Sequence, residues 1–152
     1  MARPTSTHFA VAVHVLTYLA SSAGEGRSVT SDELAISADV NPVHVRQVLG
    51  PLRDAGLVSS RPGPRGGWGL ARAADEIAVA DVWDLVRGDD PVLGLHGPNP
   101  ACPVGRSVQQ SLVDLDARVR DAARSELARV TVADLAAGVV GRAATGSAAE
   151  PA

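Results

Sequence analysis

Two short capped helices in tandem are the feature that most constrains the fold of this chain of 152 residues. Thr30 and Glu33 have the spacing of a capping box, in which each side chain bonds the backbone N–H of the other residue. Asn41-Pro42 joins a side-chain cap to the residue best suited to a first helical turn. The second helix is expected to end at Gly56, a typical left-handed C-cap. The pattern predicts a helix, a tight turn and a second helix.

The residues that follow predict a β-hairpin. A short alternating run at 57–61 precedes a turn over 62–67 that is rich in Pro and Gly, and a second strand returns over 68–72. Helix, turn, helix and hairpin is the layout of a winged helix-turn-helix, a unit that reads DNA. The fold class is therefore mainly α with a small β-hairpin wing.

Charge is distributed unevenly along the chain, whose formal net charge is −3. Residues 1–72 contain seven Arg and five acidic residues, a net of +2, whereas residues 73–152 contain seven Arg and twelve acidic residues, a net of −5. A mildly basic first half and an acidic second half fit a DNA-reading module joined to a module that does not contact DNA.

Composition excludes several protein classes. A single cysteine, Cys102, rules out an internal disulfide framework. No stretch approaches the roughly 20 apolar residues that a membrane span needs, and the first residues show no signal-peptide pattern. No Ser-His-Asp or paired-carboxylate arrangement can be argued, so the chain is not expected to be an enzyme. We expect a cytoplasmic protein without membrane contacts.

Helical periodicity also marks the first twenty residues. Phe9, Val13, Leu16 and Ala20 recur at spacings of three and four, which predicts a helix over 7–21 with these residues on its apolar face.

A second periodic segment, over 77–86, predicts another helix. The chain from 87 to 105 is punctuated by Pro and Gly and is expected to form a long ordered loop, a kind of segment that is often functional.

The longest apolar period lies between residues 106 and 130. Its members step by 4, 3, 4 and 3, and they are Val108, Leu112, Leu115, Val119 and Ala122. This heptad-like seam is narrower than the face of an ordinary core-covering helix, and it indicates a long helix that pairs with a copy of itself. The alternative is a helix that packs only on its own domain.

These segments divide the chain into four parts. Residues 1–86 form the predicted winged helix-turn-helix DNA-binding domain, and residues 87–105 form the loop. The dimerisation helix and a short terminal helix occupy 106–140, and a disordered tail rich in Ala, Gly and Ser is expected over 141–152.

Candidate DNA contacts follow from the geometry of the motif. The exposed N-terminal half of the second helix enters the major groove, where Arg reads guanine and Gln reads adenine. Arg46 and Gln47 are therefore the candidates for base reading, while His44 and Arg53 are candidates for backbone contacts. The alternative for all four residues is an ordinary solvated helix face.

The hairpin turn adds two more candidates. Arg65 lies at a tip framed by Pro and Gly, from which a guanidinium can enter a narrow minor groove. Arg61 is expected to contact a phosphate. The alternative is a plain hairpin with exposed Arg side chains.

Several of these motifs resemble the Rrf2 family of bacterial transcriptional regulators. The resemblance rests on AGLVSSR at 55–61, GPRGGW at 63–68 and LAR at 70–72, with support from 30–35 and 75–86. It implies a winged helix-turn-helix followed by a long C-terminal dimerisation helix. It also implies a homodimer that reads an inverted repeat in promoter DNA.

The chain departs from this family at its cysteines. Many members carry three cysteines in the loop before the long helix and bind an iron–sulfur cluster there, whereas Cys102 is alone. One thiolate per subunit cannot supply the usual cluster ligands, so neither a cluster nor another metal is predicted. Cys102 precedes a predicted helix N-terminus, which makes it a candidate redox sensor. The alternative is a half-buried residue that packs the loop.

These observations predict a sequence-specific transcriptional regulator, a repressor, that binds double-stranded DNA as a homodimer without a cofactor. The alternative is a protein-interaction adaptor that kept the winged fold and lost DNA binding, which the net acidity allows. The sequence does not identify an effector, whether a small molecule or a redox signal.

Overall fold

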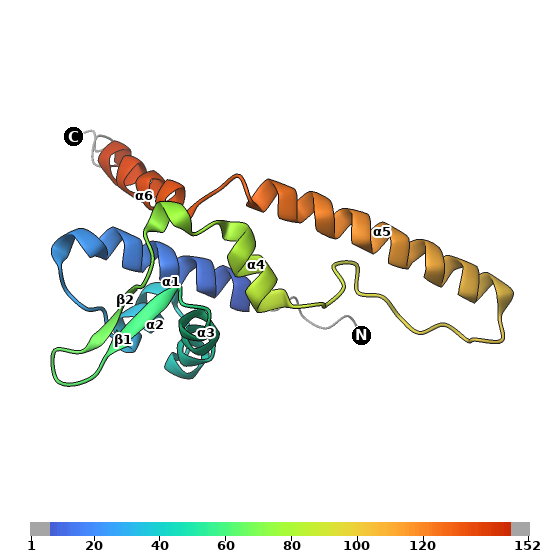
Figure 1. Ribbon diagram of the computed structural model, residues 1–152, viewed down its shortest axis with the longest axis horizontal. Coiled ribbons are helices and arrows are strands. Elements are labelled where there is room, and N and C mark those ends of the chain that lie inside the picture. Colours follow the sequence, from blue (N-terminus) through green and yellow to red (C-terminus); the bar gives the residue numbers. More distant parts are fainter. Residues whose placement is uncertain (1–6, 147–152) are drawn as a thin grey trace, which may run out of the picture.

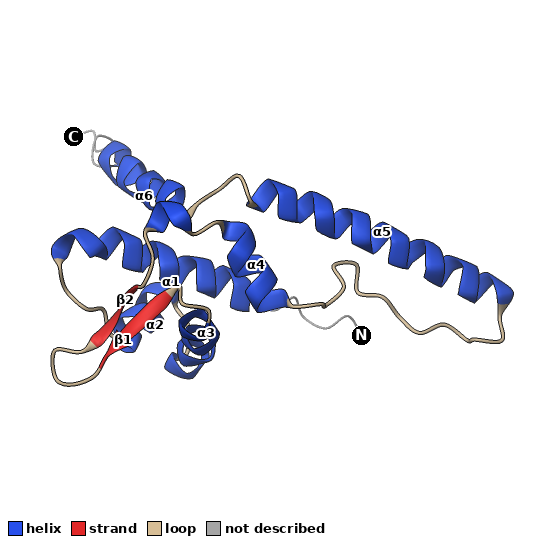
Figure 2. Ribbon diagram, in the orientation of Figure 1, coloured by secondary structure: helices blue, strands red, loops and turns tan. Residues whose placement is uncertain are grey.

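A computed structural model describes residues 7–146, and it consists of a compact body from which one long helix extends (Figure 1). The elements are, in chain order, α1 (His8–Ser22), the 3-10 turn η1 (Ala23–Glu25), α2 (Ser31–Ala38), α3 (Pro42–Asp54), β1 (Val58–Arg61), β2 (Gly67–Leu70), the 3-10 turn η2 (Ala74–Glu76), α4 (Val79–Arg87), α5 (Pro103–Leu127) and α6 (Val132–Gly146). The mainly helical architecture with one small hairpin is plain in Figure 2, and the predicted fold class is confirmed.

The tandem helices begin as their sequences predict. The Glu33 N–H donates to Thr30 Oγ1 at 3.2 Å while the Thr30 N–H donates to Glu33 Oε2 at 2.9 Å, which completes the capping box of α2. At α3 the Val43 N–H donates to Asn41 Oδ1 at 2.8 Å, with Pro42 in the first turn. These contacts satisfy backbone donors that a helix N-terminus leaves without partners.

The end of α3 is set by Gly56, whose φ is +73°. This left-handed residue lets the Leu57 N–H reach back to the Leu52 carbonyl at 2.9 Å, so the chain leaves the helix and enters β1. The predicted left-handed C-terminus of α3 is confirmed.

The core lies between α1 and the elements that surround it. Helix α1 contacts α2, α3, α4, α6 and β2, and it is the central element of the body. The largest fully buried side chains include Val15, Leu16, Leu34, Leu49, Leu52 and Ile77.

The apolar face of α1 is wider than the predicted stripe. Leu16 is fully buried and Phe9 and Val13 pack half-buried against the core, while the most buried side chains also include Val11, Val15 and Leu19. Because helices cover α1 from several sides, its buried surface is wider than one amphipathic stripe, and the spacing alone could not centre it.

The hairpin is antiparallel, and its far strand pairs with a third segment. Arg61 faces Gly67 in the register, and Val29 and Trp68 exchange backbone hydrogen bonds of 3.0 and 2.7 Å. Gly67 has φ +152°, and a Cβ there would lie 2.6 Å from the Val29 carbonyl oxygen. Only glycine permits this approach, which fixes the hairpin to the segment before α2.

Residues 79–130, here called the arm, comprise α4, the loop and α5. Its two ends meet, because the Val79 N–H donates to the Val130 carbonyl and the Val132 N–H donates to the Ile77 carbonyl, both at 2.9 Å. Between these ends α5 runs 25 residues, about 37 Å at the helical rise, and extends well beyond the body (Figure 1).

Helix α5 begins three residues earlier than predicted, at Pro103, and ends at Leu127. Cys102 occupies its N-cap position, and Pro103 suits a first helical turn. No helix in the described part of the chain is long and apolar enough to cross a membrane.

Helix α6 packs on the body. It contacts α1, and Val132 at its start is fully buried in the core. Thr131 and Asp134 form a second reciprocal cap, with the Thr131 N–H donating to Asp134 Oδ2 at 2.9 Å and the Asp134 N–H donating to Thr131 Oγ1 at 3.2 Å. The helix continues to Gly146, so the expected tail does not begin at 141; residues 147–152 lie outside the described part.

Candidate nucleic-acid interface

Helix α3 separates a buried face from an exposed one. Its inner face consists of Val45, Val48, Leu49 and Leu52, which are all buried and pack on the core. Arg46 and Gln47 are exposed on the other side, as predicted. The buried residues fix the rotation of the helix, and this rotation presents the two polar side chains to solvent.

Val43 belongs to the same exposed side, although it is not among the DNA contacts predicted from the sequence. It lies in the first turn of α3 and is 54% exposed. The available signal was the spacing, because Val43 precedes Arg46 by three residues and Gln47 by four, and such residues share one helix face.

His44 faces the body. Its ring packs against that of His8 on α1, with centroids 4.5 Å apart and planes tilted by 38°. The Nε2 atom of His44 is buried and has no hydrogen-bond partner in the described part of the chain. The structure therefore does not bring His44 together with Arg46 and Gln47.

Arg53 lies in the last turn of α3, and its side chain is 53% exposed. Its Nη2 atom is 3.4 Å from Asp54 Oδ1, and because both side chains are exposed this pairing holds the guanidinium only weakly. The residue remains accessible at the end of the helix that lies farthest from Val43.

The hairpin supplies the other predicted cations. Arg61 ends β1 and Arg65 lies in the turn, and both are exposed. The turn is closed by a hydrogen bond from the Gly66 N–H to the Gly63 carbonyl at 2.9 Å. In Figure 1 the hairpin and α3 lie on the same side of the body, opposite α6. The exposed side of α3 and the hairpin turn together form the candidate interface.

A further cation near the hairpin is already paired. The Arg27 guanidinium is 2.8 Å from Glu25 and 2.7 Å from Glu33. The hydrogen bonds that its guanidinium donates to these two carboxylates raise the pKa of Arg27 above its ordinary range. Arg27 therefore braces the start of α2, and we do not count it among the candidate DNA contacts.

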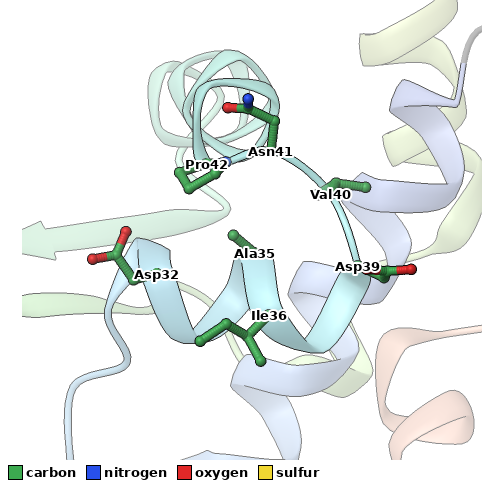
Figure 3. Close-up of a pocket in the computed structure, with 7 residues that line it drawn as sticks. All are labelled: Asp32, Ala35, Ile36, Asp39, Val40, Asn41 and Pro42. Atoms are coloured by element: carbon green, nitrogen blue, oxygen red, sulfur yellow. The ribbon is translucent and has the colours of Figure 1, made fainter.

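A hollow of about 580 Å³ lies between α2 and α3, beside the candidate interface (Figure 3). It is lined by Asp32, Ala35, Ile36, Asp39, Val40, Asn41 and Pro42. Its two carboxylates give it the wrong charge for a phosphate, so we assign DNA contacts to α3 and the hairpin and not to this hollow.

Cys102 lies at the start of α5, away from the interface. Its Sγ accepts a hydrogen bond from the Gly105 N–H at 3.4 Å, and the residue is half-buried. The described residues contain no group of three or more His, Cys, Asp or Glu that could hold a metal ion. This donor set does not fit an iron–sulfur cluster. A redox role for Cys102 stays a prediction.

The predicted seam of α5 has little cover within one chain. Val108 is 46% exposed and Leu115 is 42% exposed, whereas Leu112 and Val119 are half-buried. The inward side of α5 is marked by Asp116, only 4% exposed, which accepts the Leu93 N–H at 2.7 Å. Thus one side of α5 holds the loop, and apolar side chains remain exposed elsewhere on the helix.

Comparisons with known proteins agree with this geometry. Residues 5–138 match the Rrf2 family, described as "Iron-dependent Transcriptional regulator". The chain is 30% identical over 131 residues to the "Putative HTH-type transcriptional regulator YwnA" of Bacillus subtilis (strain 168), covering 86% of this chain and 95% of that protein.

Solved structures give the same result. The structure of CymR, described as the global cysteine regulator of B. subtilis, superposes with a TM-score of 0.65 at 27% identity, covering 89% of this chain and 97% of that one. A crystal structure described as a putative transcriptional regulator from Lactobacillus plantarum gives a TM-score of 0.73 at 31% identity, covering 88% and 89% of the two chains.

Proposed function

Because the chain belongs to the Rrf2 family of transcriptional regulators, which are not enzymes, we propose that it represses promoters by binding an inverted-repeat operator as a homodimer. The observation that carries this proposal is the exposure of Arg46 and Gln47 on α3, a helix that lies on the same side of the body as the hairpin. In a winged helix-turn-helix these two elements are the ones that meet DNA.

Each exposed side chain has a role in this proposal. Arg46 reads a guanine and Gln47 an adenine in the major groove. Arg65 enters the minor groove from the hairpin turn, and Arg53 and Arg61 contact phosphates. His44 is left out, because its ring packs on His8 and its Nε2 is buried.

The exposed apolar side chains of α5 support the homodimer. Val108 and Leu115 are seven residues apart, as members of one heptad seam are, and both are more than two-fifths exposed. A second α5 would cover them. Leu115→Asp should therefore yield monomers in analytical ultracentrifugation at micromolar concentration, whereas Asp114→Ala, an exposed neighbour, should leave the dimer intact.

Fluorescence anisotropy at two salt concentrations tests the function. It measures how tightly the protein binds DNA from the promoter region of its own gene. Affinity should fall steeply with salt, because Arg–phosphate contacts release counterions. Arg46→Ala should cost about 1–3 kcal/mol and relax specificity at one base pair. Arg129→Ala is the matched control, since its side chain is 76% exposed just after the end of α5 and is not part of the candidate interface.

Two results would contradict the proposal in different ways. Wild-type affinity in both Arg46→Ala and Arg65→Ala would show that the groove assignments are wrong. Absence of DNA retention at low salt, together with a stable complex with another protein, would favour the adaptor function. The operator is part of the bacterial chromosome, so a protein with this function acts in the cytoplasm.

A further inference from the structure

Val43 is an exposed aliphatic residue at the tip of the helix that we propose enters the major groove. It is 54% exposed, whereas the other valine and leucine side chains of α3 are buried in the core. Its backbone N–H already donates to Asn41 Oδ1 at 2.8 Å. Val43 therefore presents only its two methyl groups to whatever approaches the first turn of α3.

Gln47 and Arg46 lie on the same side of α3 as Val43. Residues separated by three or four positions in a helix have Cβ atoms about 5–6 Å apart. This separation exceeds the 3.4 Å spacing of bases along one strand, so side chains at these positions address neighbouring base pairs and not the same one.

Gly50 continues this side of α3 one turn further. A Cβ there would meet nothing within 4 Å, so the packing of the chain does not require glycine. Glycine in a helix interior costs about 0.5–1 kcal/mol relative to alanine. Its place beside Gln47 leaves room for a DNA backbone to approach the helix.

The major groove offers one apolar group, the C5-methyl of thymine, and Gln pairs with the N6 and N7 edge of adenine. We infer that Val43 contacts a thymine methyl in each half-site, next to the base pair that Gln47 reads. The inference rests on the proposed function, because it requires α3 to lie in the major groove. The group that Val43 recognises is the methyl of a thymine, in a half-site that also contains the adenine read by Gln47.

Ile36 is even more exposed, at 81%, but it is a poorer candidate for this contact. It lies on α2 and lines the hollow that also contains Asp32 and Asp39 (Figure 3). Carboxylates repel the phosphates that flank a groove, whereas Val43 has Arg46 beside it.

The test removes the thymine methyl alone. Duplexes that wild-type protein selects from a random pool are remade with deoxyuridine in place of each thymine in turn, and affinities are measured by anisotropy. Wild type should lose about fourfold in affinity per half-site at one position, the equivalent of one buried methyl group. Val43→Ala should bind the thymine duplex more weakly and should show a smaller preference for thymine over deoxyuridine there.

Val140→Ala is the matched control, because Val140 is an exposed valine, 66% exposed, on α6. It should retain the wild-type preference for thymine. If Val43→Ala keeps that preference at every position, or if wild type shows none, the inference is wrong while DNA binding stands. If wild type selects no duplex at all, the proposed function fails first, and the inference fails with it.

Discussion

Replacing Asp116 by Ala should release the loop of the arm from α5. Asp116 is 4% exposed, and its Oδ1 accepts the Leu93 N–H at 2.7 Å, joining residues 23 positions apart. Among the described side chains, only Asp116 and Ser22 are both buried and polar. The short distance indicates a charge-assisted hydrogen bond, a class that contributes about 1.5–3 kcal/mol.

A second contact adds little to this value. Arg120 Nη2 lies 3.4 Å from Asp116 Oδ2, and the Arg120 side chain is 36% exposed. Solvent screens a pair of this kind, so less than about 1 kcal/mol is at stake there. The Leu93 N–H therefore determines the expected effect, and its loss opens the loop before it unfolds the body.

Hydrogen exchange followed by NMR or mass spectrometry measures that opening. A loss of about 1.5–3 kcal/mol corresponds to about 10- to 150-fold faster exchange of the Leu93 amide in Asp116→Ala. Asp116→Asn keeps a neutral acceptor and should give a smaller acceleration. Asp114→Ala is the control, since Asp114 bonds Gln110 only on the exposed side of α5.

Exchange at Leu93 that stays within threefold of wild type in Asp116→Ala would refute this reasoning. It would mean that the loop is held by its other contacts. One is the hydrogen bond from Arg120 Nη2 on α5 to the Asp89 carbonyl at 3.3 Å, and another is Arg87, which donates to the carbonyls of Asp90 and Pro91.

Three other predictions concern the body. Leu49→Ala should lower the free energy of unfolding by about 2–5 kcal/mol in urea titrations, because Leu49 is fully buried in the core; a loss under 1 kcal/mol would show that the site collapses around the gap. Gly50→Ala should raise the free energy of unfolding by about 0.5–1 kcal/mol, since its Cβ enters open space; destabilisation in the same titration would contradict the described geometry. The pKa of Glu33 is lowered from 4.5, first by the hydrogen bond from the Thr30 backbone N–H and then by Arg27. The ionised carboxylate therefore stabilises the fold above pH 4.5, and this stabilisation is lost as the pH falls through the lowered pKa. Glu33→Gln should therefore flatten the decline of the urea midpoint below about pH 4.5, and an unchanged pH profile would argue against this role.

Local sequence signals predicted the helix-turn-helix well, because each depends on residues only two to five positions apart. Thr30 caps α2 together with Glu33, and Asn41 caps α3 by accepting the Val43 N–H. Gly56 ends α3 because glycine readily adopts a positive φ. Such contacts form within one segment, so the sequence of that segment contains what is needed to recognise them.

Contacts between distant segments were not predictable in this way. His44 turns toward His8, 36 positions earlier, and nothing near His44 in the sequence signals that partner. The return of α6 to α1 is a similar case, because Val132 joins the same core cluster as Leu16 and Leu19 near the other end of the chain. These outcomes depend on how the helices assemble. Periodicity predicts which residues share a helix face, but it does not predict which element packs against that face.

The candidate interface shows both kinds of result. Arg46 and Gln47 are exposed because the apolar residues around them in the sequence are buried, and that amphipathic pattern is local. Val43 was not among the predicted DNA contacts, although the pattern already places it off the apolar face of α3, because the candidates were chosen as side chains that can form hydrogen bonds with base edges. The extent of its exposure, 54%, depends on how α3 packs on the body, and the pattern does not specify that packing.

The paired ends of the arm have an evolutionary consequence. Ile77 and Val79 are bonded directly to Val132 and Val130, so the body is continuous across the point where the arm leaves and returns. Insertions or deletions in the loop and in the outer part of α5 can change the reach of the arm in whole helical turns without shifting the register of the core, to which α4 contributes Val82. Selection can therefore redesign what the arm responds to, or pairs with, while the apparatus that reads DNA is inherited unchanged.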